Sequence, residues 1–176
     1  MEIRLKPGTM VVLVGSTSAG KSTFARKNFK PDAVLSSDAF RLMISGDEND
    51  QTVSGDAFRL LYEVLRLRLV RGLLTVVDAT SLKTHARKDL LAIAIDHHAP
   101  ICAIVFDMDK ELLLERNRSR GDRHIPDWVI EQHCRLLQEA LPLLPQEFDR
   151  VYTLYDQTDA DEARVVIDEG QDTNNS

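Results

Sequence analysis

A glycine-rich segment near the N-terminus has the composition and spacing of a phosphate-binding loop. Gly15 and Gly20 are followed by Lys21 and Ser22 in the pattern G-x-x-x-x-G-K-[ST], directly after the apolar run 10–14. Glycines let successive backbone N–H groups turn toward phosphate oxygens, the lysine reaches the β- and γ-phosphates, and the serine hydroxyl ligates Mg²⁺. We therefore predict that a nucleoside triphosphate contacts Gly15, Ser16, Thr17, Ser18, Ala19, Gly20, Lys21, Ser22 and Thr23.

A carboxylate and an arginine follow the next apolar segment. Asp38 and Arg41 come shortly after the run 33–35, at the sheet edge where ligands bind in open α/β folds. A carboxylate beside the γ-phosphate can take the proton of an attacking hydroxyl, and an arginine fork can hold an anionic group of the acceptor. We predict catalytic roles for Asp38, Arg41 and Lys21. The alternative is that Asp38 caps a helix and forms an i,i+3 ion pair with Arg41.

A second carboxylate ends the apolar run 73–77. Asp78 stands where the Walker B segment of nucleotide-binding proteins places its carboxylate. Together with the Ser22 hydroxyl, it would hold Mg²⁺ or Mn²⁺ beside the phosphates. The alternative is that Asp78 only caps the turn at 79–81.

Four arginines lie close together between positions 116 and 123, in a chain whose net charge is −6. Arg116 and Arg120 are four residues apart and share one face of a predicted helix, whereas Arg118 points elsewhere. As a lid over the triphosphate, Arg116, Arg120 and Arg123 would neutralise charge that builds up in the transition state. The alternative is a basic helix end in solvent, which the helix dipole favours.

Short apolar runs alternate with amphipathic segments, which is the pattern of an α/β protein with a doubly wound parallel sheet. Strands are predicted at 10–14, 33–35, 73–77, 101–106 and, as the last, 151–155. Helices are predicted at 21–29, around 58–72, at 84–97 and 111–120, and at 128–144, where proline breaks end the helix. The polar tail 168–176 has little to bury, so it is expected to be disordered or to begin a linker, leaving 1–167 as one domain.

Composition and charge narrow the functional class. No apolar run is long enough for a membrane span and the N-terminus lacks a signal-peptide core, so we expect a cytoplasmic protein with no membrane partner. The excess of 28 acidic over 22 basic residues disfavours tracking along a nucleic-acid duplex but permits binding of one nucleic-acid end. The guanine-reading motif N-K-x-D is missing, which disfavours a GTPase, and the chain is short for an oligomeric ATPase module.

These features together resemble the 5′-hydroxyl polynucleotide kinase domain of bacterial polynucleotide kinase/phosphatase RNA-repair proteins. The likeness runs from about Val11 to Tyr155. The segments that carry it are 15–25, Ser37-Asp38 with Arg41, 47–53 (DENDQTV), 75–80, and 115–120 with Arg123. Thr17 and Ser18 stand where the family pattern has Ser and Gly, and the serine reduces backbone freedom at its position.

The resemblance implies a three-layer P-loop kinase fold, with a mostly parallel sheet of about five strands, helices on both faces and a helical lid. It implies transfer of the γ-phosphate of ATP or another NTP to a 5′-OH end of RNA or DNA. Family members commonly continue into phosphatase and ligase domains, which would be partners in a longer parent chain. The roles implied are phosphate and Mg²⁺ binding for Lys21 and Ser22, general base for Asp38, acceptor contact for Arg41, and donor contacts for Arg116 and Arg120.

Two other functions would keep much of this machinery. A P-loop kinase for a small molecule or tRNA, such as an adenylylsulfate-, sugar- or antibiotic-directed enzyme, would differ only in its acceptor pocket. A nucleotide-binding switch would transfer nothing and would need no base beside the γ-phosphate. Asp38 therefore separates the switch from both kinases.

Overall fold

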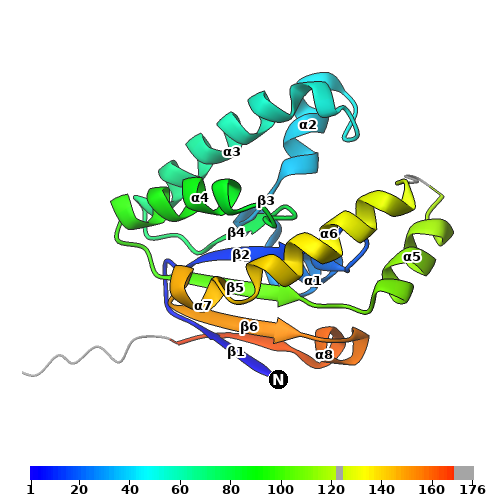
Figure 1. Cartoon of the computed structure of the whole chain (residues 1–176). Helices are drawn as coiled ribbons and strands as arrows, with labels where there is room; N and C mark the ends of the chain where they lie inside the picture. Colours follow the sequence, from blue (N-terminus) through cyan, green and yellow to red (C-terminus); the bar gives the residue numbers. More distant parts are fainter. Residues whose placement is uncertain (122–124, 169–176) are drawn as a thin grey trace, which may run out of the picture.

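The computed structural model describes residues 1–121 and 125–168. Arg123 of the predicted lid and 169–176 of the predicted tail lie outside the described residues. The described part is an α/β structure in which helices surround a parallel sheet (Figure 1). This confirms the predicted fold class.

The main sheet has five parallel strands in the order β3-β4-β2-β5-β6. From the central β2 the chain runs to the edge strand β3, returns to β4 between them, and then crosses to β5 and β6 on the other side. Parallel strands connected in this way place helices on both faces. Because all five strands are parallel, their carboxyl ends meet at one edge of the sheet. The strands are β2 (Met10–Gly15), β3 (Val34–Ser36), β4 (Thr75–Asp78), β5 (Ile101–Phe106) and β6 (Arg150–Leu154).

Eight helices and two 3-10 turns belong to the described residues. They are α1 (Lys21–Asn28), η1 (Pro31–Ala33), α2 (Ser37–Ser45), η2 (Gln51–Val53), α3 (Ser54–Leu69), α4 (Thr84–Asp96), α5 (Lys110–Ser119), α6 (Asp127–Ala140), α7 (Leu144–Glu147) and α8 (Gln157–Glu162).

The helices pack on both faces because alternate side chains of a strand point to opposite sides. Val12 and Val14 of β2 face one core, to which α3, α4 and α7 contribute. Val11 and Leu13 face a second core, to which α1, α5 and α8 contribute. Figure 1 shows α3 and α4 on one side of the sheet and α8 on the other. The structure therefore has three layers, helices, sheet and helices, and the two cores between them hold the sheet and its edge in place.

Two boundaries differ from the predictions for identifiable reasons. β4 begins at Thr75 rather than at 73, because Gly72 in the left-handed region (φ 65°) ends α3 and the Leu73 N–H still bonds the Arg68 carbonyl. α6 ends at Ala140, and Pro145 then sits in the first turn of α7 instead of only breaking a helix, since a proline needs no N–H partner there.

The prediction that the strand at 151–155 is the last one was wrong. α8 follows it, and then β7 (Arg164–Ile167) pairs in parallel with β1 (Glu2–Leu5) in a separate two-stranded sheet. β1 alternates exposed Glu2 and Arg4 with buried Ile3 and Leu5. A strand of four residues shows this alternation over only two periods, which is too short to predict a strand. Its partner β7 also lies at the other end of the chain, so the local pattern did not identify the pair.

Candidate functional site

A large cleft opens at the sheet edge formed by the carboxyl ends of the strands. Its volume is about 1660 Å³, and its walls come from the loop after β2, from α2 and η2, from the loop after β4, and from α5 and α6. In Figure 1, α2 and the α5–α6 pair stand on the side to which the arrowheads of β5 and β6 point. The predicted site residues that line the cleft are Thr17, Ser18, Gly20, Lys21, Ser22, Thr23, Asp38, Arg41, Asp78, Arg116 and Arg120.

The loop between β2 and α1 has the backbone that a phosphate cradle requires. Gly20, with φ 91°, is the N-cap of α1, so the last backbone N–H groups of the loop lie at the N-terminus of this helix. At Gly15 a Cβ would lie 3.0 Å from both the Cβ and the carbonyl oxygen of Phe106, so only glycine fits against β5. Ser18 has φ 62°, which explains why the family pattern has glycine there. Ser16 and Ala19, which belong to this loop, are buried and do not line the cleft.

Lys21 points its ammonium group back at the loop. Its Nζ donates to the carbonyl oxygens of Gly15, at 3.0 Å, and Ser16, at 2.6 Å. Burial lowers the pKa of Lys21 to about 8, and the nearby carboxylates of Asp78 and Asp38 oppose this shift. The ammonium is therefore poorly solvated and would gain from an anion placed in the loop.

Asp78 lies at the end of β4 beside the loop. It is buried, and burial raises the pKa of its carboxyl group, while a hydrogen bond from Ser22 and the charge of Lys21 act in the opposite direction. β3 pairs with β4 so that Ser36 is level with Asp78, which brings the start of α2 next to this carboxylate. Ser22 and Asp78 thus face each other, as the predicted metal site requires.

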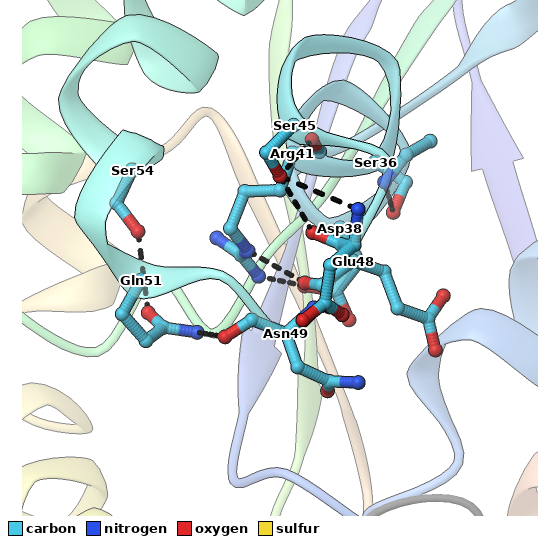
Figure 2. A network of polar contacts seen from close by, with 10 residues as sticks. Ser36, Asp38, Arg41, Ser45, Glu48, Asn49, Gln51 and Ser54 are labelled. Atoms are coloured by element: carbon cyan, nitrogen blue, oxygen red, sulfur yellow. Dashed lines mark hydrogen bonds and ion pairs between the residues drawn. The ribbon is translucent and has the colours of Figure 1, made fainter.

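Asp38 and Arg41 are held together on the first turns of α2 (Figure 2). The Arg41 guanidinium forms an ion pair with the Asp38 carboxylate and also donates from Nε to the Glu48 carbonyl oxygen at 2.8 Å. The side chain of Arg41 is 7% exposed and that of Asp38 is 41% exposed. The i,i+3 ion pair is therefore present, but the N-cap of α2 is Ser36, whose Oγ accepts from the Ala39 N–H, and not Asp38. Asp38 is left to face the cleft.

The segment 47–53 builds the wall opposite the phosphate loop. Asp50 caps η2 by accepting from Thr52, and Glu48 and Gln51 line the cleft. Gln51 receives a hydrogen bond from Ser54 of α3 at 3.2 Å (Figure 2). This segment, which carries part of the family resemblance, serves to hold Arg41 in place through a backbone carbonyl.

Arg116 of α5 and Arg120 both line the cleft. The prediction that they share one helical face was wrong, because α5 ends at Ser119 and Arg120 has an extended backbone. The Arg116 side chain lies over the phosphate loop, because a Cβ at Gly20 would come within 3.8 Å of its Nη1. It also forms a hydrogen bond with Gln157 of α8. Arg120 is close enough to Lys21 to lower its pKa. Arg118, expected to point elsewhere, is ion-paired with Asp127 at 2.6 Å.

His133 is a cleft residue that the sequence interpretation missed. It lies on α6, and its Nδ1 accepts from the Thr17 N–H at 3.4 Å and lies 3.5 Å from Ser16 Oγ. Burial, together with the charges of Lys21 and Lys83, lowers the pKa of His133 to about 4, so the imidazole is neutral. Val129, His133 and Leu136 all line the cleft at i, i+4 and i+7 spacing, a signal that could have marked this face of α6.

The loop after β4 is anchored by a buried arginine, which the sequence interpretation also missed. Arg87 of α4 is fully buried and forms a bidentate ion pair with Glu147 of α7, at 2.6 and 3.1 Å. Its Nη1 donates to the carbonyl oxygens of Ser81 and Leu82. In the same loop, the Thr80 carbonyl oxygen accepts a hydrogen bond from the Gly15 N–H, which ties the loop after β4 to the phosphate loop.

The donor set suits a divalent metal bound together with phosphates. Ser22 supplies a hydroxyl and Asp78 a carboxylate, which are hard oxygen ligands of the kind Mg²⁺ prefers. Within 1–121 and 125–168, no group of three or more His, Cys, Asp or Glu side chains could hold a metal by itself. Phosphate oxygens would therefore complete the coordination. None of the described helices has the length and apolarity needed to span a membrane.

Comparison with known proteins gives a family and a fold. The family model described as "AAA domain" matches residues 10–141. A chain from the structure of the Pnkp1/Rnl/Hen1 RNA repair complex is 26% identical, with a TM-score of 0.68 over 80% of this chain and 47% of that one. This chain thus spans about half the length of that relative. The match bears out the resemblance to RNA-repair polynucleotide kinases.

Two further solved structures share the fold. A putative kinase from Chloroflexus aurantiacus is 18% identical, with a TM-score of 0.64 and coverage of 85% of this chain and 86% of that one. A shikimate kinase from Acinetobacter baumannii is 17% identical, with a TM-score of 0.52 and coverage of 86% and 87%. At these identities the likeness concerns the P-loop kinase fold alone.

Proposed function

We propose that this chain, which belongs to the AAA-domain family and has a P-loop kinase fold, is a 5′-hydroxyl polynucleotide kinase. One observation carries the proposal: the Asp38 carboxylate lies in the same cleft as the phosphate loop and close enough to Lys21 to influence its pKa. A carboxylate beside the lysine that holds the γ-phosphate suits a phosphotransferase. A nucleotide switch would have no use for it.

The donor is ATP or another NTP. The backbone of 15–23 and the Lys21 ammonium bind its phosphates, Arg116 of α5 closes over them, and Arg120, next in the cleft, adds positive charge. Ser22 and Asp78 would hold Mg²⁺ or Mn²⁺, which supplies positive charge against the phosphate oxygens. Arg123 is assigned to the same lid.

The acceptor side performs the proton transfer. Asp38 takes the proton of the 5′-hydroxyl as its oxygen attacks the γ-phosphorus. The new O–P bond forms while the bond to the β–γ bridging oxygen breaks, and the nucleoside diphosphate leaves. Arg41 keeps Asp38 in place and presents guanidinium donors to a phosphate of the acceptor strand.

The choice of a polynucleotide over a small molecule rests on the comparisons. The similarity to a chain of an RNA repair complex is higher than that to the small-molecule kinase named above. Phosphatase and ligase domains of a longer parent chain are proposed partners, and the cytoplasm is the proposed location.

The test is to incubate the protein with γ-labelled ATP, Mg²⁺ and a single-stranded oligonucleotide that ends in a 5′-hydroxyl. We expect label on the oligonucleotide, and none when the same oligonucleotide carries a 5′-phosphate or when Lys21→Met replaces the wild type. Shikimate and gluconate serve as small-molecule acceptors in parallel. Label on a small molecule and none on the oligonucleotide would replace the polynucleotide assignment, whereas no transfer to any acceptor would favour a switch.

A further inference from the structure

A second, smaller groove adjoins the cleft between the start of α4 and the side of α6. Its volume is about 530 Å³. Lys83, His85 and Lys88 line one wall, and Leu136, Glu139 and Leu143 line the other. Lys83, His85 and Leu136 line the large cleft as well, so the two spaces are continuous. We call this second space the α4–α6 groove.

The α4 wall of the groove carries unneutralised positive charge. Lys83, His85 and Lys88 are exposed, and among the described residues none of the three forms an ion pair. In the described part of the chain, Glu139 is the only acidic side chain that lines the groove. Two lysines against one carboxylate leave the groove positive, in a chain whose net charge is −6.

This charge does not stabilise the helix that carries it. Lys83 is the N-cap of α4, no side chain caps the helix, and its first turn contains no acidic residue. Helix N-termini favour Ser, Thr, Asp or Asn caps and negative charge, because their free N–H groups carry partial positive charge. Lys83 in this position therefore costs the helix stability in the absence of an anion, whereas Lys88 lies beyond the first turn. An anion in the groove would reverse that cost.

We infer that the acceptor strand continues from the cleft into the α4–α6 groove, where Lys83 and Lys88 contact phosphodiesters downstream of the nucleotide that receives the phosphate. This inference rests on the proposed function. The basic wall matches the backbone of a single strand, and the apolar Leu136 and Leu143 face its sugars and bases. A small-molecule acceptor would end inside the cleft and would not reach Lys88, which lines the groove alone.

The experiment compares two acceptors in the wild type and in the double variant Lys83→Ala/Lys88→Ala. One acceptor is a 5′-OH dinucleotide, and the other is a 5′-OH single strand of about ten nucleotides. We expect kcat/KM for the longer strand to fall by about tenfold, with a shallower dependence on salt concentration, because contacts that release counterions are lost. The dinucleotide should lose much less activity, because it is too short to reach Lys88 in the groove.

Two matched variants sharpen the test. Lys6→Ala removes an exposed lysine that lines neither the cleft nor the groove and should change neither acceptor. Glu139→Gln removes the carboxylate that faces the lysines and should raise kcat/KM for the longer strand about twofold.

The outcomes separate this inference from the proposed function. If the wild type phosphorylates both acceptors and the double variant changes neither, or lowers both equally, the strand does not run through the groove and only the inference is overturned. If the wild type phosphorylates neither, the proposed function itself fails. Melting temperatures of all variants establish that the exposed substitutions leave the fold intact.

Discussion

The two halves of the cleft are built in different ways. The donor half comprises the phosphate loop 15–23, Asp78 and the loop 79–82, and it is buried: Lys21 and Asp78 are each 7% exposed. The acceptor half comprises α2, the segment 46–50 and η2, and it is more open: Leu42 is 50% exposed and the Asp38 side chain 41% exposed. The same chemical site therefore has one rigid wall and one solvated wall.

The difference follows from what each half must recognise. Phosphates of a nucleotide have one fixed geometry, so a half that is fixed by strand ends and backbone bonds, such as Gly15 to Thr80 at 3.0 Å, is already organised for them. The acceptor half is held by polar contacts between neighbouring residues, such as Arg41 to the Glu48 carbonyl. Such contacts leave space for acceptors of different sequence. The donor half should thus govern stability and ATP binding, and the acceptor half should govern transfer.

The largest expected effect is on transfer, through Asp38. Replacement by alanine removes the proposed base, so kcat should fall by about 10² to 10⁴-fold, while the affinity for ATP should change little. Asp38→Asn keeps the size of the side chain and should lose as much activity. Labelled transfer and calorimetric ATP binding measure the two quantities. Near wild-type turnover in either variant would show that another group accepts the proton.

The next effect tests the rigidity of the donor half. Glu147→Ala leaves the buried Arg87 guanidinium without its carboxylate, which should lower the free energy of unfolding by about 3 kcal/mol. The matched control is Glu63→Ala, which breaks the exposed pair with Arg66 and should cost at most about 1 kcal/mol. Chemical denaturation of the three proteins gives the comparison. Equal losses would mean that the buried anchor does not hold the donor half.

A smaller effect should separate Arg41 from the donor half. Arg41→Ala removes a charged donor that faces the acceptor, so kcat/KM for the oligonucleotide should fall about thirtyfold, corresponding to about 2 kcal/mol. ATP affinity should stay within about twofold of the wild type. Arg59→Ala, which removes another arginine with an i,i+3 partner, is the control and should have no effect. If the affinity for ATP falls as much as kcat/KM for the oligonucleotide, Arg41 does not belong to the acceptor half alone.

The sequence predicted the donor half better than the acceptor half, and the reason is physical. The loop pattern with its flanking strand and helix specifies backbone geometry locally, so the predicted positions of Lys21, Ser22 and Asp78 needed only the fact that parallel strands end at one edge. His133 and Arg87 belong to helices whose amphipathic patterns indicate only which face is buried. Their contacts depend on how α6 and α4 cross the sheet, which is a property of the assembled layers.

The same limit applied to the ends of the chain and to the walls of the cleft. β1 and β7 pair over a sequence separation that no local pattern bridges. The Asp38–Arg41 pair followed from the spacing of a helix, but the Glu48 carbonyl that fixes Arg41 depends on the path of the chain between α2 and η2. Resemblance to a family identified the segment 47–53 as significant, although its role as a support for Arg41 required the structure.

The smallest expected effect is a proton taken up by the donor half when a nucleotide binds. In the folded, nucleotide-free protein, burial lowers the pKa of Lys21 from its ordinary value of 10.5 to about 8. The unfolded chain therefore binds more protons than the folded one between these values, and the contribution of Lys21 to stability rises as the pH rises through that window. Phosphates in the loop favour the charged ammonium and should move its pKa back up.

Binding of ATP at pH 8 should then take up about half a proton, because about half of the Lys21 side chains are neutral at a pH equal to the pKa. At about pH 6 the lysine is already charged, so its uptake should vanish. Titration calorimetry in buffers with different heats of ionisation measures the number directly. Lys21→Arg stays charged over this whole range and should show no uptake at pH 8. Uptake that persists in this variant would assign the proton to a group other than Lys21.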